Sequence, residues 1–155
     1  IRLELSEIPD PEIPVITIEE LGVLRDVSIK GEELIITITP TYSGCPAMDR
    51  FQTDIKQKLK QMKIEQFKIV LQYDPPWTTD WLNEKAKSKL KHYGIAPPVH
   101  KSTDKSVMTG ANKTVPCPRC ETTNTEMVSQ FGSTACKSMY RCLSCLEPFE
   151  YFKCL

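Results

Sequence analysis

Two cysteine pairs near the end of the chain constrain its fold more than any other feature. Cys117 and Cys120 form one C-x2-C pair, Cys142 and Cys145 form a second, and 21 residues separate the pairs. A two-residue spacer allows both sulfurs of a pair to bind one metal ion, and two pairs complete a tetrahedron with Zn–S distances of about 2.3 Å. The spacing therefore predicts a structural zinc site with no open coordination position.

Four thiolates also suit an iron–sulfur cluster, so the sequence leaves that alternative open. A module of about 40 residues has too little core to fold unaided, and we expect the metal to supply much of its stability. Redox-active CxxC motifs would require a βαβ context that the sequence does not show. Cys136 and Cys154 are then surplus: each is expected to be a small buried hydrophobe, or alternatively an extra thiolate.

The uneven distribution of cysteine marks a domain boundary. Residues 1–93 contain one cysteine and residues 115–155 contain six, while the segment between them is rich in Pro, Lys, Ser and Thr. We predict a first domain over residues 1–95, a linker over 96–114 and a β-rich zinc ribbon over 115–155.

Net charge and hydropathy exclude several classes of partner. The 20 basic and 20 acidic residues cancel, so no overall field favours nucleic acid or an anionic membrane. No apolar run reaches the roughly 18 residues of a membrane span, and no segment resembles a signal peptide. Together with cysteines that read as metal ligands or free thiols, these features predict a cytoplasmic protein.

Hydrophobic alternation predicts the strands of the first domain. Residues 23–29 and 34–38 alternate around Gly31, which predicts a hairpin whose second strand is central. Residues 67–73 alternate in the same way and form an expected third strand. With the helices described next, the pattern predicts an α+β fold.

Steps of three and four predict the helices. Residues 46–62 form an amphipathic helix, and residues 79–93 form a second that begins at Thr79 and ends at Gly94. Earlier in the chain, Thr17 and Glu20 fit a capping box around one helical turn.

Cys45 stands apart from the other cysteines, in the segment TYSGCPAMD. If Pro46 is the first helical residue, Cys45 is the N-cap, and the helix dipole would hold its sulfur as a thiolate with a lowered pKa. The alternative is a compact cap whose thiol packs between hairpin and helix. The residues alone do not favour either interpretation.

Five motifs in a fixed order resemble the PaaD family of accessory proteins in bacterial phenylacetate degradation. They are IPDPEIPVITIEELGVLRDV, PTYSGCPAMD, DPPWTTDW, HYGIAPP and FGSTACKSMYRCLSCLEPFEYFKC. The first 95 residues separately resemble the wider SufT-like family. This resemblance implies a fold similar to the iron–sulfur cluster assembly domain, and a non-enzymatic role in the maturation of iron–sulfur or metal proteins.

The resemblance also implies functional residues. The family's Gly-Cys-Pro cysteine falls on Cys45 and its acidic loop on Asp10 and Glu12; with Thr78 and Asp80, these residues are expected to line one surface. A site with one thiolate suits a transient iron–sulfur cluster whose other ligands come from a partner or a second copy of the chain, which makes a homodimer a candidate assembly.

The implied partners are subunits of the phenylacetyl-CoA epoxidase, either its reductase or its di-iron subunit. One alternative is a non-catalytic subunit of that monooxygenase complex, and another is a scaffold whose cysteines never touch a transferable metal. The chain shows no Glu-x-x-His pairs for a di-iron site and no glycine fingerprint for a flavin or nicotinamide.

Overall fold

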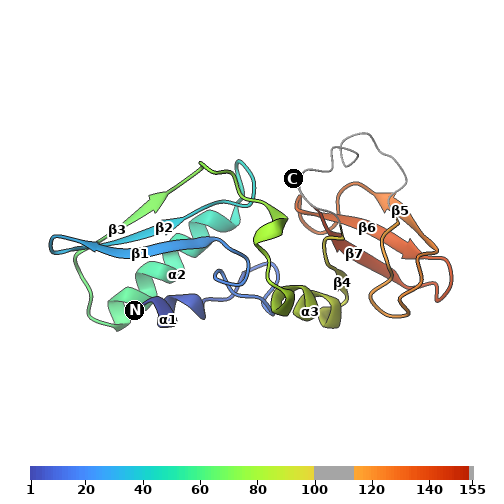
Figure 1. The fold of residues 1–155 in the computed structure, drawn as a ribbon, viewed down its shortest axis with the longest axis horizontal. Helices are drawn as coiled ribbons and strands as arrows, with labels where there is room; N and C mark the ends of the chain where they lie inside the picture. The colour runs from blue at the N-terminus through green and yellow to red at the C-terminus, as the bar shows by residue number, and fades with distance from the viewer. Residues whose placement is uncertain (100–113, 154–155) are drawn as a thin grey trace. The chain divides into compact units, whose positions relative to one another are not determined.

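The protein is described by a computed structural model that covers residues 1–99 and 114–153. It divides into two compact units, Ile1–Trp77 and Thr78–Leu155, which are described in turn (Figure 1). Most of the predicted linker over 96–114 lies outside the described residues. None of the helices in the described part of the chain has the length and apolarity that a membrane crossing requires.

The first unit is a three-stranded sheet with one long helix. Its elements are α1 (Arg2–Ser6), β1 (Leu24–Lys30), β2 (Glu33–Ile38), α2 (Ala47–Gln61) and β3 (Phe67–Leu71). β1 pairs antiparallel with β2, and β3 pairs parallel with β2, so α2 is the crossover between two parallel strands. The predicted hairpin, central strand, long helix and third strand are confirmed.

The core of this unit lies between α2 and one face of the sheet. Figure 1 shows α2 running along the sheet. In β2, Leu34, Ile36 and Ile38 alternate on one face and are buried, while Phe51 and Ile55 recur at helical spacing and are 1% and 0% exposed. Each such side chain contributes about 1.5–3 kcal/mol by leaving water, so the unit has a continuous apolar core of its own.

A proline-containing loop precedes the sheet. Its ends are joined because Ile18 N–H donates to the Ile8 carbonyl over 2.9 Å. The predicted capping box is confirmed: Glu20 N–H donates to Thr17 Oγ1 at 3.3 Å, and Thr17 N–H donates to a Glu20 carboxylate oxygen at 3.2 Å. Trp77, the last residue of the unit, fixes the same turn, since its indole N–H donates to the Leu21 carbonyl at 2.8 Å.

The second unit contains a four-stranded sheet preceded by a helix. Its elements are η1 (Thr79–Trp81), α3 (Glu84–Tyr93), β4 (Ile95–Ala96), β5 (Thr125–Ser129), β6 (Lys137–Cys142) and β7 (Pro148–Phe152). The strand order is β4-β7-β6-β5, with β4 parallel to β7 and the other pairs antiparallel. The small β-rich ribbon expected from the cysteine pairs is therefore present, with one additional strand.

The predicted start of the second helix was wrong. Thr79 begins a single 3-10 turn, because Leu82 is extended (φ −69°, ψ 125°) and interrupts the helix. The N-cap of α3 is Asn83, whose side-chain oxygen accepts a hydrogen bond from Ala86 N–H at 2.8 Å. The end was predicted correctly: Gly94 caps the helix with φ +92°, a left-handed conformation that favours glycine.

The two compact units divide after Trp77, and the predicted domain boundary at residue 95 stays a prediction. At that boundary, β4 belongs to the second unit. Ile95 pairs with Glu150 and Ala96 pairs with Tyr151, so this strand belongs to the ribbon sheet. Residues so far apart in sequence leave no local pattern that would reveal their pairing.

Candidate functional site

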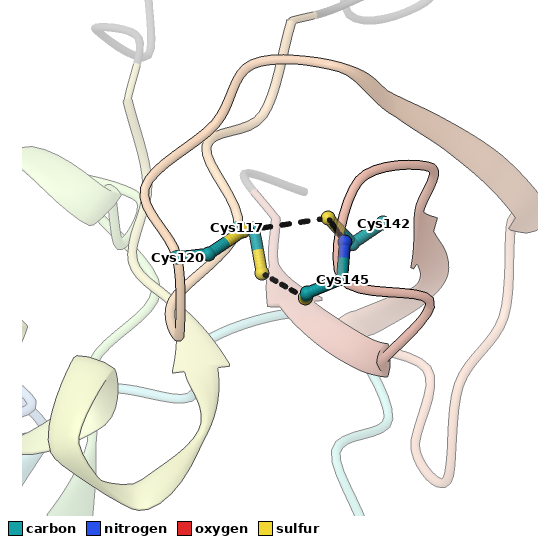
Figure 2. Close-up of side chains that lie close together, drawn as sticks. All are labelled: Cys117, Cys120, Cys142 and Cys145. Carbon is teal, nitrogen blue, oxygen red and sulfur yellow. Dashed lines mark hydrogen bonds between the residues drawn. The ribbon is translucent and has the colours of Figure 1, made fainter.

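Four cysteines of the second unit come together at one end of the ribbon. Figure 2 shows the side chains of Cys117, Cys120, Cys142 and Cys145 converging from two loops. Their sulfur atoms all lie within 4.8 Å of one another. The Cys117–Cys145 sulfur distance is 3.8 Å and the Cys120–Cys142 distance is 3.6 Å. In a tetrahedron with Zn–S bonds of about 2.3 Å, the sulfurs lie about 3.8 Å apart. The observed sulfur positions therefore suit one metal ion coordinated by four thiolates.

The two loops share one backbone geometry. In each, the N–H of the first cysteine donates over 2.9 Å to the carbonyl of the residue five positions later, Thr122 or Glu147. In each, the residue after the second cysteine has a positive φ, 61° at Glu121 and 65° at Leu146. This reversal of the backbone turns both sulfurs of a pair toward one point. Two cysteines with a two-residue spacer can therefore bind the same ion.

Backbone amides compensate charge on the sulfurs. Cys145 N–H donates to Cys142 Sγ at 3.3 Å. Burial raises the pKa of Cys142, but amides of Cys145 and Ser144 outweigh it and lower that pKa to about 6. For Cys145, the Glu147 amide lowers the pKa, whereas the hydrogen bond to Cys142, burial and the other sulfurs together raise it to about 12. Binding of a metal by all four thiolates would therefore release protons.

Accessibility differs within the group. Cys117 and Cys142 are buried, whereas Cys120 and Cys145 are exposed. An ion pair between Arg119 and Glu147, 3.2 Å apart, links the two loops. The site is thus anchored in the ribbon core on one side and open to solvent on the other.

Two further cysteines of the second unit, Cys136 and Cys154, do not belong to either pair. Among the described residues, the metal-binding group contains the four paired cysteines and does not include Cys136. Cys136 is 7% exposed, and its sulfur lies 3.1 Å from Thr134 Oγ1. Cys154 lies outside the described residues, so a ligand role for either residue stays a prediction.

Cys45 in the first unit differs from the activated thiolate of the sequence analysis. Pro46 is the N-cap of α2, with helical φ −67° and ψ −21°, and the helix begins at Ala47. Cys45 is only 9% exposed, and Thr41 Oγ1 donates to its sulfur at 3.9 Å. Burial raises the pKa of the thiol; hydrogen bonds from Ala47, Thr41 and Tyr42 oppose this without cancelling it. Of the two interpretations that the sequence left open, these observations favour the packed thiol over the thiolate with a lowered pKa.

The acidic loop residues have different roles. Asp10 is 6% exposed, and one of its carboxylate oxygens accepts hydrogen bonds from Glu12 N–H at 2.8 Å and Ile13 N–H at 2.7 Å. Asp10 therefore organises the loop. Glu12 is half-buried, and its charge is a minor contribution to the raised pKa of Cys45, after burial.

Thr78 and Asp80 belong to the second unit. Thr78 is the half-buried N-cap of η1 and Asp80 is exposed. Their grouping with Cys45 on one surface stays a prediction. Thr41, which contacts the Cys45 sulfur, is a further residue of this site, and its place in the same PTYSGCP turn was the only signal for it in the sequence.

Comparisons with known proteins agree with this arrangement. A family model described as "Iron-sulfur cluster assembly protein" matches residues 1–68, and one described as "PaaD zinc beta ribbon domain" matches residues 101–153. A relative from Escherichia coli (strain K12), named as one subunit of a "Putative 1,2-phenylacetyl-CoA epoxidase", is 48% identical over 151 residues, which cover 97% of this chain and 89% of the relative. The chain belongs to the PaaD family. The family resemblance inferred from the motifs is confirmed.

The first part of this PaaD-family chain has relatives of its own. A "Fe-S protein maturation auxiliary factor" of Porphyromonas gingivalis (strain ATCC BAA-308 / W83) is 33% identical over 88 residues, 56% of this chain and 83% of that protein. A crystal structure of a domain of unknown function, DUF59, from Bacillus anthracis superposes with a TM-score of 0.51 at 27% identity, covering 57% of this chain and 85% of that one. The predicted α+β assembly-type fold is confirmed.

Proposed function

We propose that this protein is a non-enzymatic accessory factor in the cytoplasm that supports maturation of a phenylacetyl-CoA epoxidase, by helping to insert an iron–sulfur cluster or metal. One observation carries the proposal: a chain similar over 97% of its length to a protein named as part of that epoxidase begins with an iron–sulfur cluster assembly domain. The client would be the reductase or the di-iron subunit.

The four-cysteine group would hold zinc as a structural ion. The spacing of its sulfurs supports tetrahedral coordination by four thiolates, which leaves no open position for a substrate. In this role the four-cysteine ion stabilises a folded surface for a protein partner, and the ion itself takes no part in transfer.

Cys45 is the candidate ligand for the transferred cluster or metal, which is here a substrate. Its burial and raised pKa support a protonated, sheltered thiol in the absence of cargo. A soft metal would have to displace that proton, and Glu12 lies close enough to influence the exchange. Because a single thiol that ionises only on binding holds a cluster or metal weakly, it favours transient binding. The client or a second copy of the chain would supply the further ligands.

The test is the metal content of the client. Cells that lack this protein and express Cys45→Ser should yield epoxidase reductase and di-iron subunits, at least one of which is deficient in iron or sulfide; wild-type protein should restore both. Cys136→Ser is the matched comparison, because it removes another buried thiol outside the four-cysteine group; a deficiency with this variant as well would make Cys136 a further ligand. Full iron and sulfide in both clients with Cys45→Ser would refute the transfer role.

A non-catalytic subunit of the epoxidase is the second candidate, favoured by the name of the 48% identical relative. The two candidates differ in timing. A subunit would co-purify stoichiometrically with active epoxidase, and its withdrawal from mature enzyme would abolish activity. A maturation factor could be withdrawn from mature enzyme without loss.

A further inference from the structure

β4 and α3 are physically continuous with the metal group, although they precede it by more than 20 residues. β4 adds to the ribbon sheet through β7, beside which it lies in Figure 1. Ala96 is 1% exposed and belongs to the buried cluster that also contains the ligands Cys117 and Cys142. The core around the ligands is therefore partly built from a segment outside the matched ribbon region of residues 101–153.

α3 is joined to β4 without an intervening loop. Gly94 alone separates them, and its N–H donates to the Lys91 carbonyl at 3.1 Å to close the last helical turn. Ala86 and Leu90 of the helix are each 0% exposed. Because Gly94 alone lies between the two elements, movement of β4 would displace the end of α3.

A second connection runs from α3 directly to the first metal-binding loop. The Lys91 ammonium forms an ion pair with the carboxylate of Glu121, the residue that follows Cys120. The backbone of Glu121 is set by that loop: it has φ 61°, and its N–H donates to the Cys117 carbonyl at 2.9 Å. The position of the Glu121 carboxylate thus depends on the conformation that Cys117 and Cys120 adopt around one ion.

We propose that occupation of the four-cysteine site controls the docking of residues 84–96, so that α3 and β4 are ordered on the ribbon when metal is bound and released when it is lost. This inference rests on the metal-binding part of the proposed function. A small thiolate module without its ion loses most of its folding free energy, and β4 would lose its partner strand with it. Thr78 and Asp80 lie just ahead of α3 in the chain, so metal status would also govern how firmly these candidate residues are held.

Hydrogen exchange followed by mass spectrometry on the full chain tests the proposal, with Zn²⁺ as the probe. Removing zinc with a chelator should raise exchange rates across residues 84–96 by at least about tenfold, together with those of β6 and β7. Exchange in α2 should not change. Unaltered exchange of residues 84–96 in zinc-free protein, while β6 and β7 lose protection, would overturn the proposal.

A second test follows from thermodynamic linkage. If zinc binding favours the docking of residues 84–96, the docking of these residues must favour zinc binding to the same extent. Lys91→Glu should weaken zinc affinity, measured by competition with a chromophoric chelator, by about twofold to fivefold, the range expected for an exposed ion pair. Adding Glu121→Lys should restore affinity and exchange protection. Lys87→Glu is the matched control, since Lys87 pairs with Glu84 within the same helix, and it should leave zinc affinity unchanged.

The charge swap also covers the case in which Lys91→Glu fails to fold. Refolding of the swapped chain would support the coupling, and failure of the swap to recover either readout would overturn it. A client that acquires its full iron without Cys45 would refute the delivery role and leave these exchange results intact, so the two proposals fail separately.

Discussion

The two units of this protein obtain stability in different ways. The first has a helix on a three-stranded sheet, with side chains such as Phe51 and Ile55 almost completely buried. The second has a thinner apolar cluster that includes two of its own metal ligands, Cys117 and Cys142. The cysteines are accordingly expected to differ in their contribution to stability. Cys45 adds to a core that already exists, whereas we expect the paired cysteines to complete a core that would otherwise be too small.

Loss of a metal ligand should have the largest effect, and only on the second unit. Cys142→Ser removes a buried thiolate, and we expect loss of bound zinc together with the ordered sheet β4–β7, while the first unit keeps its unfolding transition. Metal analysis and hydrogen exchange measure both effects. Cys136→Ser should retain zinc; if Cys142→Ser also retained protection in β6 and β7, the contrast between the units would be wrong.

The converse substitution addresses the first unit. Phe51→Ala leaves a cavity beneath the sheet and should destabilise that unit by about 3–5 kcal/mol in denaturant titrations, with zinc content unchanged. Phe131→Ala is the control. That ring is 65% exposed, and the Lys153 ammonium lies 4.5 Å from its centroid, so its loss should cost less than about 1 kcal/mol. Equal effects would contradict the assignment of the core.

The second unit also contains a buried ion pair. Lys137 Nζ lies 2.9 Å from Glu150, with side chains 4% and 19% exposed, and Glu150 also accepts from Ser133 N–H at 2.6 Å. Glu150→Gln would strand the lysine and should cost about 3 kcal/mol. Asp54→Asn, which breaks the Arg50–Asp54 pair on the surface of α2, should cost about 0.5 kcal/mol or less.

The same pair gives a pH dependence. Burial raises the pKa of Glu150, but Ser133 and Lys137 outweigh it and leave that pKa below its ordinary value. A lowered pKa means that the stabilisation is fully present above the unfolded value of about 4.3 and is lost as pH falls through the folded value. The stability difference between wild type and Glu150→Gln should therefore shrink below about pH 4. A stability difference that stays constant with pH would show that the ionisation of Glu150 does not contribute to stability.

Cys45 should react slowly at neutral pH. Because burial raises its pKa, the thiolate fraction at pH 7.4 is small, and alkylation by iodoacetamide should be at least about tenfold slower than for a free peptide thiol. The midpoint of the rate–pH profile should lie above the ordinary cysteine value. Rapid labelling at neutral pH would instead support an ionised Cys45 thiolate at the helix N-terminus. Raised pKa also means that Cys45 stabilises the fold below the unfolded value of about 8.5 and loses that contribution as pH rises through the folded value.

The smallest expected effect concerns the second metal-binding loop. Leu146 is 62% exposed and holds φ 65°, a conformation that costs a side chain with a Cβ roughly 1 kcal/mol. Leu146→Gly should therefore stabilise the zinc-loaded unit by up to about 1 kcal/mol in thermal unfolding. A destabilisation would mean that the exposed leucine makes contacts which outweigh its backbone strain.

The sequence predicted those features that depend on neighbouring residues. The cysteine spacing specified the metal group, the alternation around Gly31 specified the hairpin, and the capping pair Thr17–Glu20 formed as expected. Features that depend on distant residues could not be read in this way. The burial of Cys45, the pairing of Ile95 with Glu150 and the Lys137–Glu150 ion pair all require the tertiary fold.

The strand order of the second sheet has a consequence for biosynthesis. The strands of the first unit are all translated by Leu71, so that unit can fold while the ribosome is still at work. β4 is translated early, but its pairing partner β7 ends only at Phe152. β4 therefore stays unpaired until β7 has been translated. The sheet of the second unit can therefore form only after every strand of the first unit has been translated.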